Sequence, residues 1–106
     1  MTNILKKIIE DKKETLDLIK KNNSLDSLEK KIKNLYFFNN FKKKIQNNKG
    51  ISLISEIKKA SPSAGVIVKN FNHLDIAKIY ADNGSTCLSV LTEEKHFYGK
   101  LDYITD

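Results

Sequence analysis

The stretch that decides the fold reads Leu53-Ile54-Ser55-Glu56-Ile57-Lys58-Lys59-Ala60-Ser61-Pro62-Ser63. Side chains of a β-strand alternate between two faces, so Ile54, Glu56 and Lys58 share one face and the intervening residues share the other. Burying a charged group costs several kcal/mol unless the charge is paired. A carboxylate and an ammonium at the C-terminal end of an otherwise apolar strand therefore indicate a functional site at that end.

The residues after this strand predict a polar loop. Pro62 fixes φ and has no backbone N–H, so it can continue neither a sheet ladder nor a helix interior. Ser61, Ser63 and Gly65 add hydroxyl groups and accessible backbone amides.

The first half of the sequence predicts helices. Apolar residues from Ile4 to Ile19 recur at helical spacing, which predicts an amphipathic helix over about residues 3–21 with Thr2 as its N-cap. Asn22 and Asn23 end this helix, and Ser24 can cap a second, shorter one. A lysine-rich helical turn through Ile45 follows, and residues 47–50 break it.

The second half predicts a strand-helix-strand unit. The strands span about residues 52–58 and 86–92, and Asn72 can cap a helix between them that ends at Asn83-Gly84. Such a unit builds a parallel sheet with a right-handed crossover.

Two motifs in this order resemble one known family. The run Glu56-x-Lys58-Lys59-Ala60-Ser61-Pro62-Ser63 resembles the signature of the indole-3-glycerol-phosphate synthases of tryptophan biosynthesis. The run Ser89-Val90-Leu91-Thr92-Glu93-Glu94-Lys95-His96-Phe97-Tyr98-Gly99 resembles the same family's second strand and following loop.

The resemblance implies an α/β fold, the N-terminal portion of a (βα)8 TIM barrel preceded by a helical extension. Residues 1–50 correspond to the helical extension. Residues 51–106 correspond to the first βαβ unit and the start of the second helix. A typical barrel has roughly 250 residues, so we expect an N-terminal portion that is inactive by itself.

The implied activity is that of a carbon-carbon lyase, a carboxy-lyase. It closes the ring of 1-(2-carboxyphenylamino)-1-deoxyribulose 5-phosphate to indole-3-glycerol phosphate with loss of carbon dioxide and water. By resemblance, Lys58 holds the aromatic carboxylate and relays protons, and Glu56 stabilises positive charge near the anilino nitrogen.

The resemblance also implies substrate-binding positions. Loop residues Ser61, Pro62 and Ser63 line the pocket near the substrate phosphate. Ser89 and Leu91 form pocket walls, and Phe97 lines the slot for the anthranilate ring. No external cofactor is implied, because the substrate carries its own electron sink, and no metal-ligand spacing is present.

Composition bears on partners and location. The first 50 residues hold thirteen lysines against six acidic residues, within a net charge of +6. Arginine, the side chain suited to bidentate phosphate contacts, is absent, so we expect no nucleic acid partner. No apolar run approaches the ~20 residues that cross a bilayer, so we expect no membrane partner and a cytoplasmic protein. The expected partner is a small phosphorylated substrate, and the resemblance allows fusion or association with other tryptophan-pathway enzymes.

Other interpretations stay open at this point. Without the family match, Glu56 and Lys58 would be an ion pair on an exposed strand face, and Phe97 a loop anchor. The chain as a whole could be a small basic binding module or a non-catalytic interaction protein. Cys87 is predicted to be a small core residue. His73 and His96 are predicted to be surface residues without partners at catalytic spacing.

Overall fold

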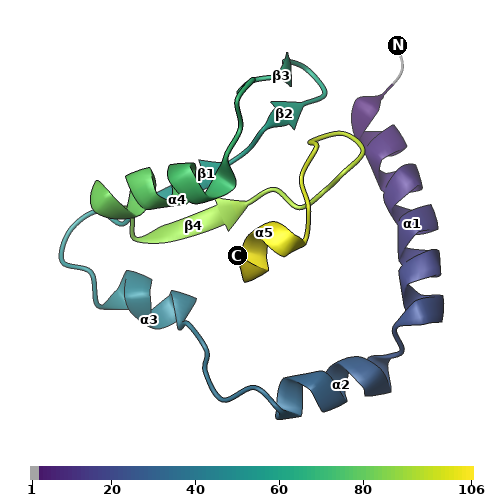
Figure 1. Ribbon diagram of the computed structural model, residues 1–106, viewed down its shortest axis with the longest axis horizontal. Helices are drawn as coiled ribbons and strands as arrows, with labels where there is room; N and C mark the ends of the chain where they lie inside the picture. The colour runs from purple at the N-terminus through teal and green to yellow at the C-terminus, as the bar shows by residue number, and fades with distance from the viewer. Residues whose placement is uncertain (1–2) are drawn as a thin grey trace. The chain divides into compact units, whose positions relative to one another are not determined.

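The first compact unit is helical. The computed structural model describes residues 3–106, and its first unit, which ends at Asn39, contains α1 (Ile4–Asn22) and α2 (Leu25–Lys33) (Figure 1). The side chain of Asn3 caps α1 by accepting from the Leu5 amide at 3.1 Å, whereas the predicted cap Thr2 lies outside the described residues. Ser24 caps α2 as predicted. Within residues 3–106, no helix combines the length and apolar character needed to span a membrane.

The second unit runs from Asn40 to Asp106 and contains the remaining elements. In chain order these are α3 (Phe41–Gln46), β1 (Ile54–Ile57), β2 (Ala60–Ser61), β3 (Gly65–Val66), α4 (His73–Asp82), β4 (Cys87–Val90) and α5 (Asp102–Thr105). The helix α3 thus belongs to the second compact unit. The division at residue 50 between a helical extension and a barrel portion stays a prediction.

Strands β1 and β4 form a parallel pair, as the strand-helix-strand pattern predicts (Figure 1). Ile54 pairs with Cys87 and Glu56 pairs with Ser89. Both strands are shorter than predicted, because regular pairing covers only four residues of each. The register places alternate residues of the two strands on a common face.

Helix α4 covers the other face of β1. Its N-cap Asn72 accepts from the Leu74 and Asp75 amides at 3.0 and 3.1 Å, which confirms the predicted start of the helix. Ser55 and Ile57, which alternate with the charged residues, are buried. The Tyr80 hydroxyl of α4 donates to the Glu56 backbone carbonyl at 2.9 Å and ties the helix to the strand.

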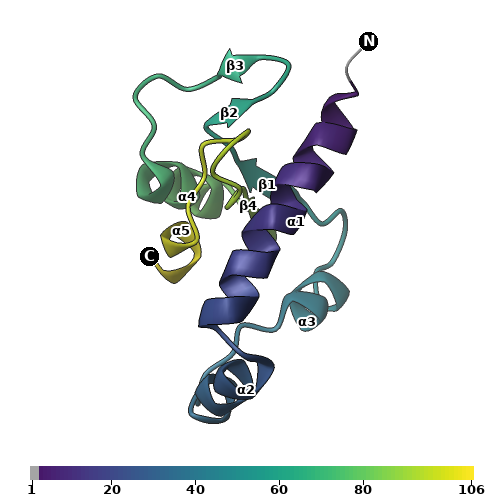
Figure 2. The same ribbon diagram turned by 90° about the vertical axis from the view of Figure 1, so that its right-hand side faces the viewer.

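The predicted polar loop folds into a small hairpin. Strand β2 pairs antiparallel with β3, with Ala60 opposite Val66, and the two stand apart from β1 and β4 (Figures 1 and 2). Pro62 lies in the turn, where its missing N–H removes no ladder bond. Gly65 has φ +64°, a conformation that glycine adopts without steric penalty. The sequence pattern did not predict this pairing.

His73 is partly exposed and has a partner that the sequence did not predict. Its Nε2 lies 2.7 Å from Oδ2 of Asp106, and its side chain is only 20% exposed. The imidazole also stacks on the Tyr103 ring at a centroid distance of 4.2 Å. His73 therefore joins the start of α4 to α5 rather than pointing freely into solvent.

We expect Asn72→Ala to lower the free energy of unfolding by about 1 kcal/mol, because two amides at the start of α4 lose their acceptor. Urea denaturation followed by circular dichroism at 222 nm measures this change. Asn70→Ala is the matched control, since Asn70 precedes the cap and is exposed. Equal midpoints for the two variants would show that the cap contributes nothing.

Candidate active site

Glu56 and Lys58 meet at the C-terminal end of β1. The Lys58 Nζ lies 2.9 Å from the Glu56 Oε1, and the two side chains are 33% and 48% exposed, respectively. The structure therefore brings the two residues together on one side of the chain, as the alternation predicts. An ion pair this exposed contributes about 1 kcal/mol or less to stability. This small contribution does not explain why two charged residues stand at the end of this strand.

Ser89 of β4 and Leu91, the residue that follows β4, lie at the same end of the sheet. Ser89 is the register partner of Glu56, and the Leu91 amide donates to the Ile57 carbonyl at 3.1 Å. Paired residues of parallel strands point to the same face, so Ser89 lies beside Glu56. Cys87, two residues earlier on this face, is only partly buried, so the prediction of a core cysteine is wrong.

The hairpin holds Ser61, Pro62 and Ser63. The two hydroxyl groups lie 3.3 Å apart, and the Ser61 hydroxyl also accepts from the Ala64 amide at 3.2 Å. These bonds stay within the hairpin, which begins two residues after Lys58. The hydroxyl groups thus have a defined arrangement close to the ion pair in sequence.

Phe97 lies half-buried in the turn that follows β4. Its amide donates to the Glu93 carboxylate at 3.0 Å. Gly99 closes this turn with its amide 2.8 Å from the Glu93 carbonyl. The turn therefore has a fixed backbone at the same end of the sheet as Glu56 and Lys58.

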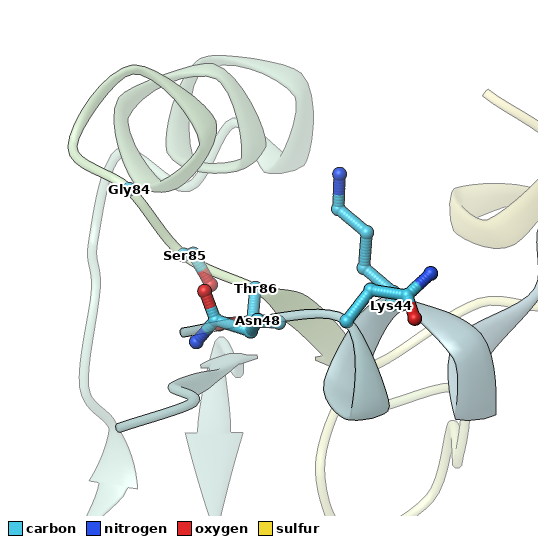
Figure 3. Close-up of a pocket in the computed structure, with 6 residues that line it drawn as sticks. Lys44, Asn48, Gly84, Ser85 and Thr86 are labelled. Carbon is cyan, nitrogen blue, oxygen red and sulfur yellow. The ribbon is translucent and has the colours of Figure 1, made fainter. Parts of the chain in front are cut away.

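A polar hollow of about 310 Å³ lies at the opposite, N-terminal end of β4 (Figure 3). Its lining residues come from α3 with the turn after it and from the α4–β4 turn: Lys44, Asn47, Asn48, Gly84, Ser85 and Thr86.

Three of the polar side chains that line this hollow, those of Asn48, Ser85 and Thr86, already bond to nearby residues. The side-chain amide of Asn48 donates to the Ile51 carbonyl at 3.1 Å, and the Thr86 hydroxyl accepts from the Leu53 backbone amide at 3.0 Å. Ser85 lies 2.8 Å from both the Ser55 hydroxyl and the Cys87 carbonyl. We therefore interpret the hollow as a structural feature and not as a binding site. Its hydrogen bonds fix the N-terminal ends of β1 and β4.

Three residues of this end of the sheet were not singled out from the sequence. Tyr80 anchors β1, Glu93 accepts from the turn amides, and Gly99 is buried. An acidic residue just before a helical turn is a signal for amide capping and could have indicated Glu93. The Tyr80 hydroxyl bonds to a residue 24 positions away in the sequence, and no local sequence pattern indicates such a contact. Among residues 3–106, no group of three or more His, Cys, Asp or Glu side chains is arranged to hold a metal ion.

Comparison with known proteins agrees with the two motifs. The sequence profile of the indole-3-glycerol phosphate synthase family matches residues 5–106. The chain belongs to this family. The resemblance inferred from the residues around Glu56 and Ser89 is thereby confirmed.

Curated indole-3-glycerol phosphate synthases match over nearly all of the chain. The synthase of Desulforamulus reducens is 44% identical over 103 residues, which are 97% of this chain and 39% of the relative. That of Clostridium acetobutylicum is 45% identical over 102 residues, which are 95% of this chain and 38% of the relative. That of Dehalococcoides mccartyi is 60% identical over 52 residues, which are 49% of this chain and 20% of the relative. The chain spans about two-fifths of the length of the first two synthases.

We expect Gly99→Ala to destabilise the turn after β4, because an added Cβ would clash with the Leu91 carbonyl oxygen. Overpacking of this kind costs about 1–3 kcal/mol. Urea denaturation gives the loss in the free energy of unfolding, and amide exchange at residues 91–99 locates it. The exposed neighbour provides the control variant Lys100→Ala, and equal stability of the two variants would contradict the packing.

Proposed function

We propose that this chain supplies the N-terminal part of the active site of an indole-3-glycerol phosphate synthase. The reaction converts 1-(2-carboxyphenylamino)-1-deoxyribulose 5-phosphate into indole-3-glycerol phosphate, carbon dioxide and water. The single observation that carries the proposal is the ion pair of Glu56 and Lys58 at the C-terminal end of β1, within a chain that belongs to this family.

In this proposal Lys58 binds the aromatic carboxylate of the substrate. An ammonium has three N–H donors, and the bond to Glu56 uses one of them. The remaining donors suit a second carboxylate, and a charge-assisted bond of this kind is roughly twice as strong as a neutral one. Lys58 would then orient the carboxylate that leaves as carbon dioxide and relay a proton.

Glu56 acts beside the reacting nitrogen. Its second carboxylate oxygen remains able to accept a hydrogen bond, because the contact to Lys58 uses Oε1. A carboxylate here stabilises positive charge that develops near the anilino nitrogen during ring closure. The anchor from Tyr80 to the Glu56 backbone supports this role by fixing the strand that carries the carboxylate.

The remaining predicted positions bind the substrate without taking part in proton transfer. We assign the hairpin residues Ser61, Pro62 and Ser63 to the phosphate end. Ser89 and Leu91 form the wall beside Glu56, and their positions in β4 and directly after it support this assignment.

Phe97 contacts the anthranilate ring in this proposal. Its half-buried position in the turn after β4 supports the assignment.

We further propose that the parallel pair of β1 and β4 is the start of a (βα)8 barrel and that residues 1–50 form a helical extension. Active sites of such barrels are built from loops at the C-terminal ends of several strands. The ion pair is one-third to one-half exposed here, so we expect residues 1–106 alone to be inactive. The proposed protein is a cytoplasmic lyase that acts on a small phosphorylated substrate without an external cofactor, in association with other tryptophan-pathway enzymes where these are present.

A hybrid enzyme tests this function. Residues 1–106 replace the matching segment of the Desulforamulus reducens synthase, and release of indole-3-glycerol phosphate is measured. We expect the hybrid to be active and Lys58→Ala to lower kcat/KM by about 10²–10⁴-fold, the range for a lost proton-transfer group. Glu56→Gln should lower kcat, because it removes the negative charge and keeps the size of the side chain.

Lys69→Ala is the matched control for the loss of a lysine, because Lys69 is exposed and lies outside the proposed site. An active hybrid in which Lys58→Ala and Lys69→Ala have equal kcat/KM would refute the assignment. An inactive but folded hybrid would refute the proposed function itself.

A further inference from the structure

The turn after β4 is built around the carboxylate of Glu93. One oxygen accepts from the Lys95 amide at 3.1 Å. The other accepts from the His96 amide at 2.7 Å and from the Phe97 amide at 3.0 Å. Three backbone donors that would otherwise need water thus converge on one side chain.

The same turn is closed at its far end. The Tyr98 amide donates to the Glu94 carbonyl at 3.1 Å, and the Gly99 amide donates to the Glu93 carbonyl at 2.8 Å. Tyr98 has φ +53°, which is uncommon for a residue with a side chain. Gly99 is buried against the Leu91 carbonyl, where a side chain has no space. The backbone on both sides of Phe97 is therefore fixed.

We propose that Glu93 is a positioning residue that sets the place of the Phe97 ring at the C-terminal end of β4. The proposal rests on the proposed function for the role of Phe97 toward the aromatic ring of the substrate. Its structural part, the dependence of the Phe97 backbone on the Glu93 carboxylate, stands on the three hydrogen bonds alone.

The bonding of Glu93 argues against a direct chemical role. Hydrogen bonds from amides to a carboxylate are charge-assisted and stronger than neutral ones. Both oxygens are occupied, and abstracting a proton would give up bonds that hold the turn together. Glu93 therefore acts through Phe97 and not on the substrate.

Glu94 offers a matched control from the same turn. It carries the same charge at the next position and is exposed. The three turn amides bond to the Glu93 carboxylate, and Glu94 contributes only its backbone carbonyl to the turn. Removing either carboxylate changes the net charge equally, so only the capping bonds differ between the two variants.

Amide hydrogen exchange by NMR on the 106-residue chain tests the structural part. We expect Glu93→Ala to speed exchange at residues 95–97 by about tenfold or more, and Glu93→Gln to have a smaller effect because one acceptor oxygen remains. Glu94→Ala should leave these rates within about twofold of the parent, as expected for an exposed surface change. Equal exchange rates in Glu93→Ala and Glu94→Ala would overturn the proposal.

Kinetics of the hybrid enzyme test the link to the substrate ring. Glu93→Ala should raise KM by about tenfold with a smaller change in kcat, because a displaced Phe97 weakens binding of the ring. Faster exchange together with an unchanged KM would overturn this link. An inactive parent hybrid would count against the proposed function alone, since the exchange rates still decide whether Glu93 positions the turn.

Discussion

The arrangement of this site depends on the parallel register of β1 and β4. Because Glu56 pairs with Ser89, the alternation of side chains puts both on the face that also carries Ile54 and Cys87. A shift of one residue in either strand would move its whole set of side chains to the opposite face. The buried Ser55 and Ile57 on the α4 side oppose such a shift, since Glu56 would then have to be buried against the helix.

The two ends of this sheet differ in role. Hydrogen bonds that fix the strands lie at one end, and side chains available for chemistry lie at the other. At the N-terminal end, the side chains of Asn48, Ser85 and Thr86 are all bonded to nearby chain atoms. At the C-terminal end, the exposed pair of Glu56 and Lys58 keeps unused donors and acceptors. Parallel α/β folds commonly place stabilising contacts and functional residues in this way.

The sequence predicted those features that have a local pattern. The Asn72 cap, the helix end at Asn83-Gly84 and the shared side of Glu56 and Lys58 follow from spacing along a single element. The family followed from two motifs at the ends of the strands.

Features that join distant residues could not be predicted. The contact of His73 with Asp106 spans 33 residues, and the bond from Tyr80 to Glu56 spans 24. The hairpin of β2 and β3 involves only two residues on each side, too few for a periodic signal. Cys87 was predicted to be a core residue from its position within a strand, but it is only partly buried, on the face of the sheet that also carries Glu56.

Disulfide trapping with the single native cysteine tests the register most directly. Paired residues of neighbouring strands lie about 4.8 Å apart, within the Cα separation that a disulfide allows. The register predicts that Ile54→Cys forms an intrachain disulfide with Cys87 on mild oxidation, whereas Ser55→Cys, which points toward α4, does not. Trapping by Ser55→Cys without trapping by Ile54→Cys would place Glu56 on the helix side and contradict the proposed site.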